Sequence, residues 1–135
     1  MSVYSVGLVS APYHAAVQRM EEMTTERLEA SPSSMLTSVI KVQGVFEIPL
    51  QVQTLLERDD IDAVITLGAI EEGETGHGVA LSNAVFPALL GLSLRFNKPV
   101  GFGIIGPLAT PEQIESRAEK TAKEATSAVL DSLGC

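Results

Sequence analysis

Short apolar runs alternate with longer amphipathic segments along the whole chain, and this alternation constrains the fold more than any other feature. Runs rich in β-branched residues predict buried strands, and the segments between them carry apolar residues at helical spacing. Parallel neighbours need crossover connections, which the helical segments supply. We therefore predict an α/β fold in which helices flank a four-stranded parallel sheet on both faces. The predicted strands are residues 3–10, 35–42, 62–67 and 100–105, and the predicted helices are residues 15–29, 49 to the closing Asp59-Asp60 pair, 79–97, and 111–133 after the N-cap Thr110.

Composition narrows the class of protein. A length of 135 residues fits one domain, residues 1–135. With 9 Lys and Arg against 17 Asp and Glu, the formal charge is −8, so the chain lacks the clustered basic surface that binds nucleic acids and anionic membranes. The one cysteine, Cys135, excludes a disulfide framework and a cysteine metal cluster. The N-terminus has no signal-peptide pattern, and residues 84–94 are shorter than a membrane span, so we expect a cytoplasmic protein that enters no membrane.

The third predicted helix, residues 79–97, is apolar nearly all round. Pro87 lies inside this helix and predicts a kink. A helix of this kind must bury both sides, and a four-stranded sheet covers only one of them. We therefore predict that a second copy of the chain covers the other side, in a homo-oligomer.

A glycine-rich segment without periodicity, residues 68–78, follows the third predicted strand. Ligands of doubly wound sheets bind at the carboxyl ends of strands, and free N–H groups at a helix start attract anions. The segment lacks the P-loop lysine and the G-x-G-x-x-G spacing, so it predicts an anion site of another kind. His77 lies in this segment and can move a proton near neutral pH, with the helix dipole keeping the imidazole neutral. The alternative is an exposed loop histidine beside capping glycines.

Carboxylates offer two further candidates. The chain has only two histidines, too few for a histidine-based metal site. A solvated acidic loop explains its clustered glutamates better than a cation site does. We therefore predict no bound metal. Glu47 lies between two large apolar residues, where we expect it to be buried, and a carboxylate in such surroundings predicts a bound ligand. The clustered glutamates are Glu71, Glu72 and Glu74.

Three basic residues follow one another at helical spacing in the last predicted helix: Arg117, Lys120 and Lys123. In an acidic chain they predict an anionic partner. Ion pairs with neighbouring glutamates on a solvated helix explain them equally well, and both interpretations stay open.

Five segments together resemble the lumazine synthase family, in register from about Gln43 to the C-terminus and closest to its archaeal branch. The two most specific motifs are Gly-x-Phe-Glu-x-Pro, which ends at Pro49, and Gly-Glu-Thr-x-His, which ends at His77. The other three segments are residues 62–68, the Lys-Pro-Val-Gly-Phe-Gly run of residues 98–103, and Arg117 in the last helix.

The resemblance implies a flavodoxin-like three-layer sandwich that assembles as a pentamer, or as twelve pentamers in an icosahedral shell. It also implies active sites between adjacent subunits. The expected reaction condenses 5-amino-6-(D-ribitylamino)uracil with 3,4-dihydroxy-2-butanone 4-phosphate to give 6,7-dimethyl-8-ribityllumazine. Phosphate and two waters are lost, and no cofactor takes part.

The resemblance further implies a role for each matching residue. His77 is the expected acid/base group, which assists phosphate elimination and the proton transfers. The phosphate is expected to be held by the backbone of Glu74 and Thr75 and by Arg117. The ribityl-pyrimidine is expected to be held by Val45, Phe46 and Glu47. Phe102 is expected to close the pocket from the neighbouring subunit.

This chain departs from the family's pattern at three places. After the first strand Tyr13 stands near the position of a stacking aromatic ring, and Ile70 is followed by Glu71 where a second apolar residue is usual. A lysine expected beyond the arginine is replaced by Ala125, which leaves Lys123 as the nearest substitute. Two alternatives to the enzyme therefore stay open: an inactive shell or scaffold, and a flavodoxin-like module for another phosphorylated or flavin-like ligand.

Overall fold

The computed structural model describes residues 2–135, and Met1 lies outside the described residues. The predicted alternation of strands and helices is confirmed, with one addition, a short 3-10 turn before the second helix. In chain order the elements are β1 (Tyr4–Ser10), α1 (Ala15–Ala30), β2 (Ser34–Lys41), the 3-10 turn η1 (Val45–Glu47), α2 (Ile48–Leu56), β3 (Ala63–Glu71), α3 (His77–Phe96), β4 (Val100–Ala109) and α4 (Pro111–Leu133).

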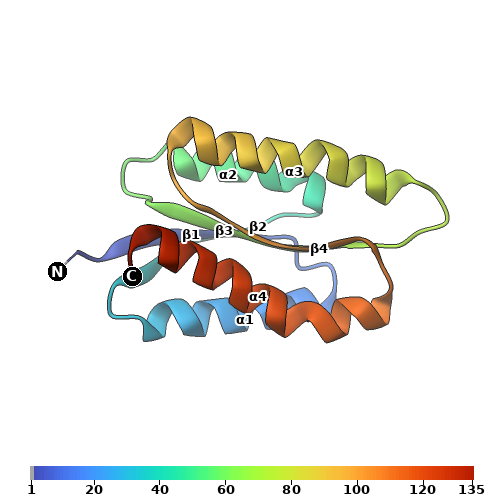
Figure 1. Ribbon diagram of the computed structural model, residues 1–135, viewed down its shortest axis with the longest axis horizontal. Coiled ribbons are helices and arrows are strands. Elements are labelled where there is room, and N and C mark those ends of the chain that lie inside the picture. The colour runs from blue at the N-terminus through green and yellow to red at the C-terminus, as the bar shows by residue number, and fades with distance from the viewer. Residues whose placement is uncertain (1) are drawn as a thin grey trace.

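The four strands form one parallel sheet in the order β2-β1-β3-β4. Helices α1 and α4 cover one face of this sheet, and α2 and α3 cover the other, which gives the three layers seen in Figure 1. The predicted fold class is therefore confirmed. Because the strand order reverses between β1 and β3, a crevice is expected at their carboxyl ends.

The sheet separates two hydrophobic cores. Val6 and Leu8 of β1 point into the core under α1 and α4, and Val9 points into the core under α2 and α3. This alternation is the period of two that a strand imposes on its side chains. At the start of α4 a capping box fixes the helix, because Gln113 N donates to Thr110 Oγ1 at 3.2 Å and Thr110 N donates to Gln113 Oε1 at 3.0 Å.

Strands β3 and β4 run further than the sequence predicts. We expected β3 to end at residue 67 and β4 to end before Gly106-Pro107, but they continue to Glu71 and Ala109. A register shift lets the two extensions pair, so that Glu71 lies opposite Ala109 and Glu72 N donates to Ala109 O at 2.7 Å. Gly106 makes this possible because it has φ of +106° and lies where a side chain would overlap the Ile70 carbonyl.

Helix α3 is a single helix that begins at His77, two residues before the predicted start, and continues through Pro87 to the left-handed Asn97. Val85 and Leu89 are buried against the sheet, but Leu90 and Leu94 are exposed, Leu94 by 73%. Within residues 2–135 α3 alone is long and apolar enough to cross a membrane by length and composition, so the expectation that no stretch reaches that length is wrong. One face of α3 belongs to the core, and its opposite, apolar face is uncovered in the single chain.

Candidate functional site

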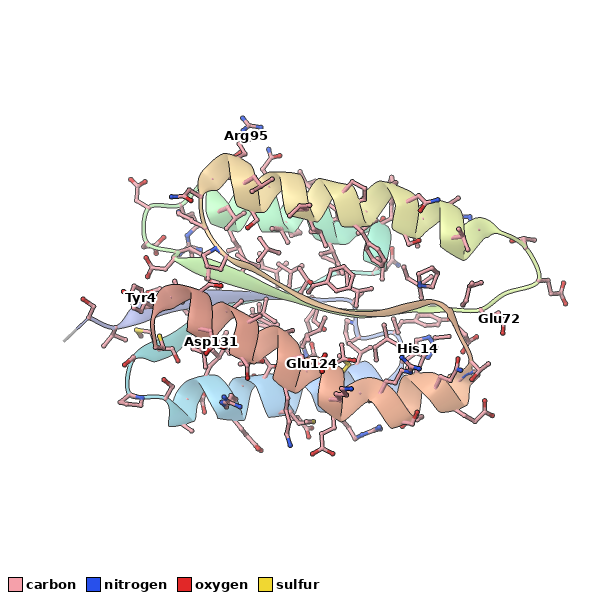
Figure 2. All side chains as sticks on the ribbon, in the orientation of Figure 1. Tyr4, His14, Glu72, Arg95, Glu124 and Asp131 are labelled. Atoms are coloured by element: carbon pink, nitrogen blue, oxygen red, sulfur yellow. The ribbon has the colours of Figure 1, made fainter. Side chains whose placement is uncertain are left out.

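All four strands end at the same edge of the sheet because they are parallel. Four connections leave this edge. They are residues 11–14 after β1, residues 42–44 with η1 after β2, residues 72–76 after β3, and Thr110 between β4 and α4. Figure 2 shows His14 and Glu72 at this end of the molecule, and Tyr4 and Arg95 at the other end. The structure therefore brings the sequence-predicted segments of the site to one edge, around the β1/β3 switch point.

His77 is the first residue of α3, and Gly76 precedes it as the N-cap. Thr75 Oγ1 accepts a hydrogen bond from His77 N at 3.3 Å, so the threonine hydroxyl satisfies one of the free N–H groups at the helix start. The imidazole is exposed. This arrangement presents a proton carrier and the positive end of a helix dipole to the same volume of solvent.

The 3-10 turn η1 presents two side chains and buries a third. Val45 is buried and lies against β3, where a Cβ on Gly68 would be 3.1 Å from Val45 Cγ2. The close approach holds η1 over the end of β3. Phe46 is 69% exposed and Glu47 is also exposed. The expectation that Glu47 is buried is therefore wrong for the single chain, because the turn directs only Val45 and Ile48 into the core.

The end of β3 and the following loop contain the predicted phosphate-binding segment. Ile70 is buried in the core under α2 and α3, whereas Glu71, Glu72, Glu74 and Thr75 are exposed. No group of three or more His, Cys, Asp or Glu side chains in the part of the chain that the structure describes is arranged to hold a metal ion. The loop thus offers backbone N–H groups and unpaired carboxylates.

Arg117 and Lys123 lie on α4, in the layer opposite α3 (Figure 1). Arg117 is exposed and takes part in no ion pair among residues 2–135. Lys123 Nζ instead lies 3.1 Å from Glu119 Oε1, beside the groove between α1 and α4. Within one chain the sheet separates Arg117 from His77.

Two aromatic residues complete the predicted site. Phe102 lies on the edge strand β4, half-exposed, and its ring packs edge-on against Phe86 of α3 with 4.6 Å between centroids. Tyr13 is 85% exposed in the connection after β1 and makes an edge contact with His14. Both rings leave a face free to meet another molecule.

Gly44 borders the candidate site, and the sequence alone gave it no role. A Cβ built on Gly44 would lie 3.1 Å from Glu47 Oε1, so the glycine borders the carboxylate directly. The only sequence signal was its place in the Gly-x-Phe-Glu-x-Pro motif, because spacing alone does not tell which way a glutamate side chain turns.

The chain matches the family model described as 6,7-dimethyl-8-ribityllumazine synthase over residues 4–134. Similar proteins that carry this name include one from Metallosphaera sedula, 52% identical over 93 residues, and one from Saccharolobus solfataricus, 48% identical over 92 residues. These alignments cover 69% and 68% of this chain but only 62% and 60% of the two relatives.

A third relative aligns over nearly its whole length. The protein of the same name from Methanobrevibacter smithii is 36% identical over 135 residues, which cover 98% of both chains. The match to the family model extends from β1 almost to the last residue and includes η1, the loop before α3 and α4. The chain therefore belongs to the 6,7-dimethyl-8-ribityllumazine synthase family.

Proposed function

We propose that this chain is an active transferase of riboflavin biosynthesis, which condenses 5-amino-6-(D-ribitylamino)uracil with 3,4-dihydroxy-2-butanone 4-phosphate. The observation that carries the proposal is the placement of His77 at the start of α3, directly after the Glu74-Thr75 loop and at the same sheet edge as η1. A condensation of an amine with a ketone needs mainly positioning, a phosphate site and one proton carrier. The product is 6,7-dimethyl-8-ribityllumazine, and only the two substrates take part.

Each step of this reaction has a group that suits it. The amine adds to the ketone and water leaves, phosphate is eliminated, and closure of the second ring releases another water. His77 moves protons in these steps, and the loop backbone at Glu74 and Thr75 holds the phosphate at the helix start. Phe46 packs on the pyrimidine, and Glu47 accepts hydrogen bonds from ribityl hydroxyls, which its exposed carboxylate can reach.

We further propose that the active form is a ring of copies, a pentamer or an assembly of pentamers. The apolar face of α3 needs a cover, and half-exposed apolar side chains lie on both edges of the sheet: Val39 on β2, and Phe102 and Leu108 on β4. Contacts between opposite edges of identical chains are heterologous and generate rings when the rotation closes. Arg117 and Phe102 then reach the neighbour's site. The free thiol of Cys135 suits a reducing compartment, and we propose the cytoplasm.

Product formation tests the reaction. The purified protein is mixed with both substrates, and lumazine is followed by absorbance and fluorescence, with the His77→Ala variant as the matched control. We expect turnover in the natural chain and a large loss in the variant. A natural chain that forms large assemblies by light scattering but makes no lumazine would establish the scaffold alternative instead.

Mixing two damaged chains tests the shared site. In a ring, His77→Ala chains and Arg117→Ala chains that are unfolded and refolded together form some sites with both natural residues. Random mixing gives about a quarter of such sites, so we expect about a quarter of the natural activity from two weakly active parents. Activity equal to the mean of the parents would place both residues in one chain's site.

A further inference from the structure

The Glu47 side chain turns back over Gly44 instead of extending away from the protein. Glu47 N donates to Gly44 O at 3.1 Å, which closes the 3-10 turn, and Glu47 Oε1 lies 3.1 Å from the position that a Cβ on Gly44 would take. Among residues 2–135 no hydrogen bond or ion pair holds this carboxylate. Its position therefore depends on the space that Gly44 leaves open.

The backbone does not require a glycine at this position. Gly44 has φ of −148° and ψ of 172°, an extended conformation that any residue adopts. Within residues 2–135, Glu47 Oε1 is the only heavy atom within 4 Å of a Cβ built there, apart from the chain neighbours. A methyl group at position 44 would thus displace the far end of one flexible side chain and nothing in the core.

We propose that Gly44 is a positioning residue for the ribityl-pyrimidine, because it keeps the Glu47 carboxylate in the orientation that accepts the ribityl hydroxyls. This inference rests on the proposed function. A Cβ contact of 3.1 Å is shorter than an ordinary van der Waals contact, so an added methyl group moves the carboxylate or changes its rotamer. Hydrogen bonds weaken steeply once distance and angle leave their narrow range, so the bound polyol senses this displacement.

The Gly44→Ala variant separates this role from a structural one. We expect the Kd and KM for 5-amino-6-(D-ribitylamino)uracil to rise about tenfold, as for the loss of one hydrogen bond to a charged group. The KM for the ketone phosphate should stay within about twofold, because Gly44 lies in a different connection from the phosphate loop. The melting temperature should not fall, since Gly→Ala at a compatible backbone conformation stabilises a fold.

Two further variants identify the route of the effect. In a Glu47→Ala background the Gly44→Ala change should have no effect on pyrimidine affinity, because the carboxylate that it displaces is absent. Gln43→Ala changes the preceding exposed residue without placing an atom against Glu47, and we expect natural affinity.

Three outcomes would overturn the inference. Unchanged pyrimidine affinity in Gly44→Ala, in a natural chain that makes lumazine, would refute the positioning role alone. A full tenfold effect that persists in the Glu47→Ala background would show that Gly44 acts through another contact. A natural chain that neither binds the pyrimidine nor makes lumazine would refute the proposed function, and the positioning role with it.

Discussion

Three carboxylates beside a phosphate site should weaken substrate binding, and their removal should improve it. Glu71, Glu72 and Glu74 are exposed, and none of them takes part in an ion pair within the described chain. Each lies within a few residues of the start of α3, where the proposed function places the dianionic phosphate of the ketone. The perturbation is the triple variant Glu71→Gln, Glu72→Gln and Glu74→Gln, which keeps size and removes charge.

The magnitude follows from Coulomb's law. The proposed phosphate lies against the backbone of Glu74 and Thr75, up to four residues from the loop glutamates, so at about 3.3 Å per extended residue we take one common separation on the order of 9 Å for the three carboxylates. In water one carboxylate then repels a dianion by about 0.9 kcal/mol, and three repel it by about 2.7 kcal/mol without screening. Salt screens this total repulsion. At 0.01 M salt the Debye length is about 30 Å and about 2 kcal/mol of repulsion remains. At 0.1 M it is about 10 Å and about 1.1 kcal/mol remains, and at 1 M it is about 3 Å and about 0.1 kcal/mol remains.

We therefore expect the triple variant to have a lower KM for the ketone phosphate than the natural chain, by about 30-fold at 0.01 M salt, about sixfold at 0.1 M, and not measurably at 1 M. Steady-state lumazine formation at the three salt concentrations measures this ratio. The uncharged pyrimidine serves as an internal control, because its KM should show no such trend. Any attraction by Arg117 is common to both proteins and cancels in the ratio.

A second triple variant, with Gln at Glu22, Glu26 and Glu29 of α1, makes the same change in net charge away from the loop. We expect this control to keep the natural KM. A lower KM in both variants would mean that overall charge acts, and a ratio that stays large at 1 M salt would mean that the glutamine side chains make new contacts. An unchanged KM at 0.01 M would remove the phosphate from this loop and refute the site assignment.

Four further predictions concern single residues. His77→Ala should lower kcat by about 10²–10⁴-fold, the range for a lost acid/base group, and an unchanged kcat would exclude His77 from proton transfer. Arg117→Ala should chiefly raise the KM for the ketone phosphate, and a change confined to the pyrimidine KM would contradict its role as a phosphate ligand. Thr110→Ala removes the α4 N-cap and should lower the free energy of unfolding by about 1 kcal/mol in urea titrations. Asp60 accepts a hydrogen bond from Arg58, which lowers the pKa of the Asp60 carboxyl. The stability from this pair is therefore present above the ordinary carboxyl pKa and is lost as the pH falls through the lowered pKa of Asp60. At neutral pH the Asp60→Asn variant should therefore have a lower melting temperature than the natural chain. In acid the two melting temperatures should converge.

The sequence predicts the fold well because its signals are local. β-branched runs, the proline after Thr110 and the apolar spacing of the helices all act within one element, and each places its strand or helix to within a few residues. The glycine-rich segment also lies where the sequence predicts it, at the carboxyl edge of the sheet. Its length is wrong, since the first residues of the segment belong to β3 and not to a loop.

The remaining features depend on contacts between elements, which spacing does not report. The extension of β3 and β4 needs the register shift around Gly106, and that shift exists only because two distant segments pair. Glu47 is exposed because a 3-10 turn, stabilised by Val45 against β3, changes which side chains face inward. Lys123 has a partner of its own in Glu119, which helical spacing allowed as one of two outcomes.

The separation of Arg117 from His77 explains why a chain of this size would need a neighbour. A parallel sheet directs its carboxyl-end connections to one edge, but its helices lie on two faces, so a cation on α4 and a histidine on α3 have the sheet between them (Figure 1). Under the proposed function, one face of a single chain thus offers His77 and the loop before α3 without Arg117, and the other face offers Arg117 without that loop. Two chains placed edge to edge can supply both groups to one site, with the half-exposed Phe102 of β4 at the same contact. The uncovered apolar face of α3 adds a reason to associate that is independent of catalysis. An Arg117→Ala chain should therefore assemble normally while binding the ketone phosphate poorly, whereas a Leu94→Glu chain should lose the assembly and the activity together.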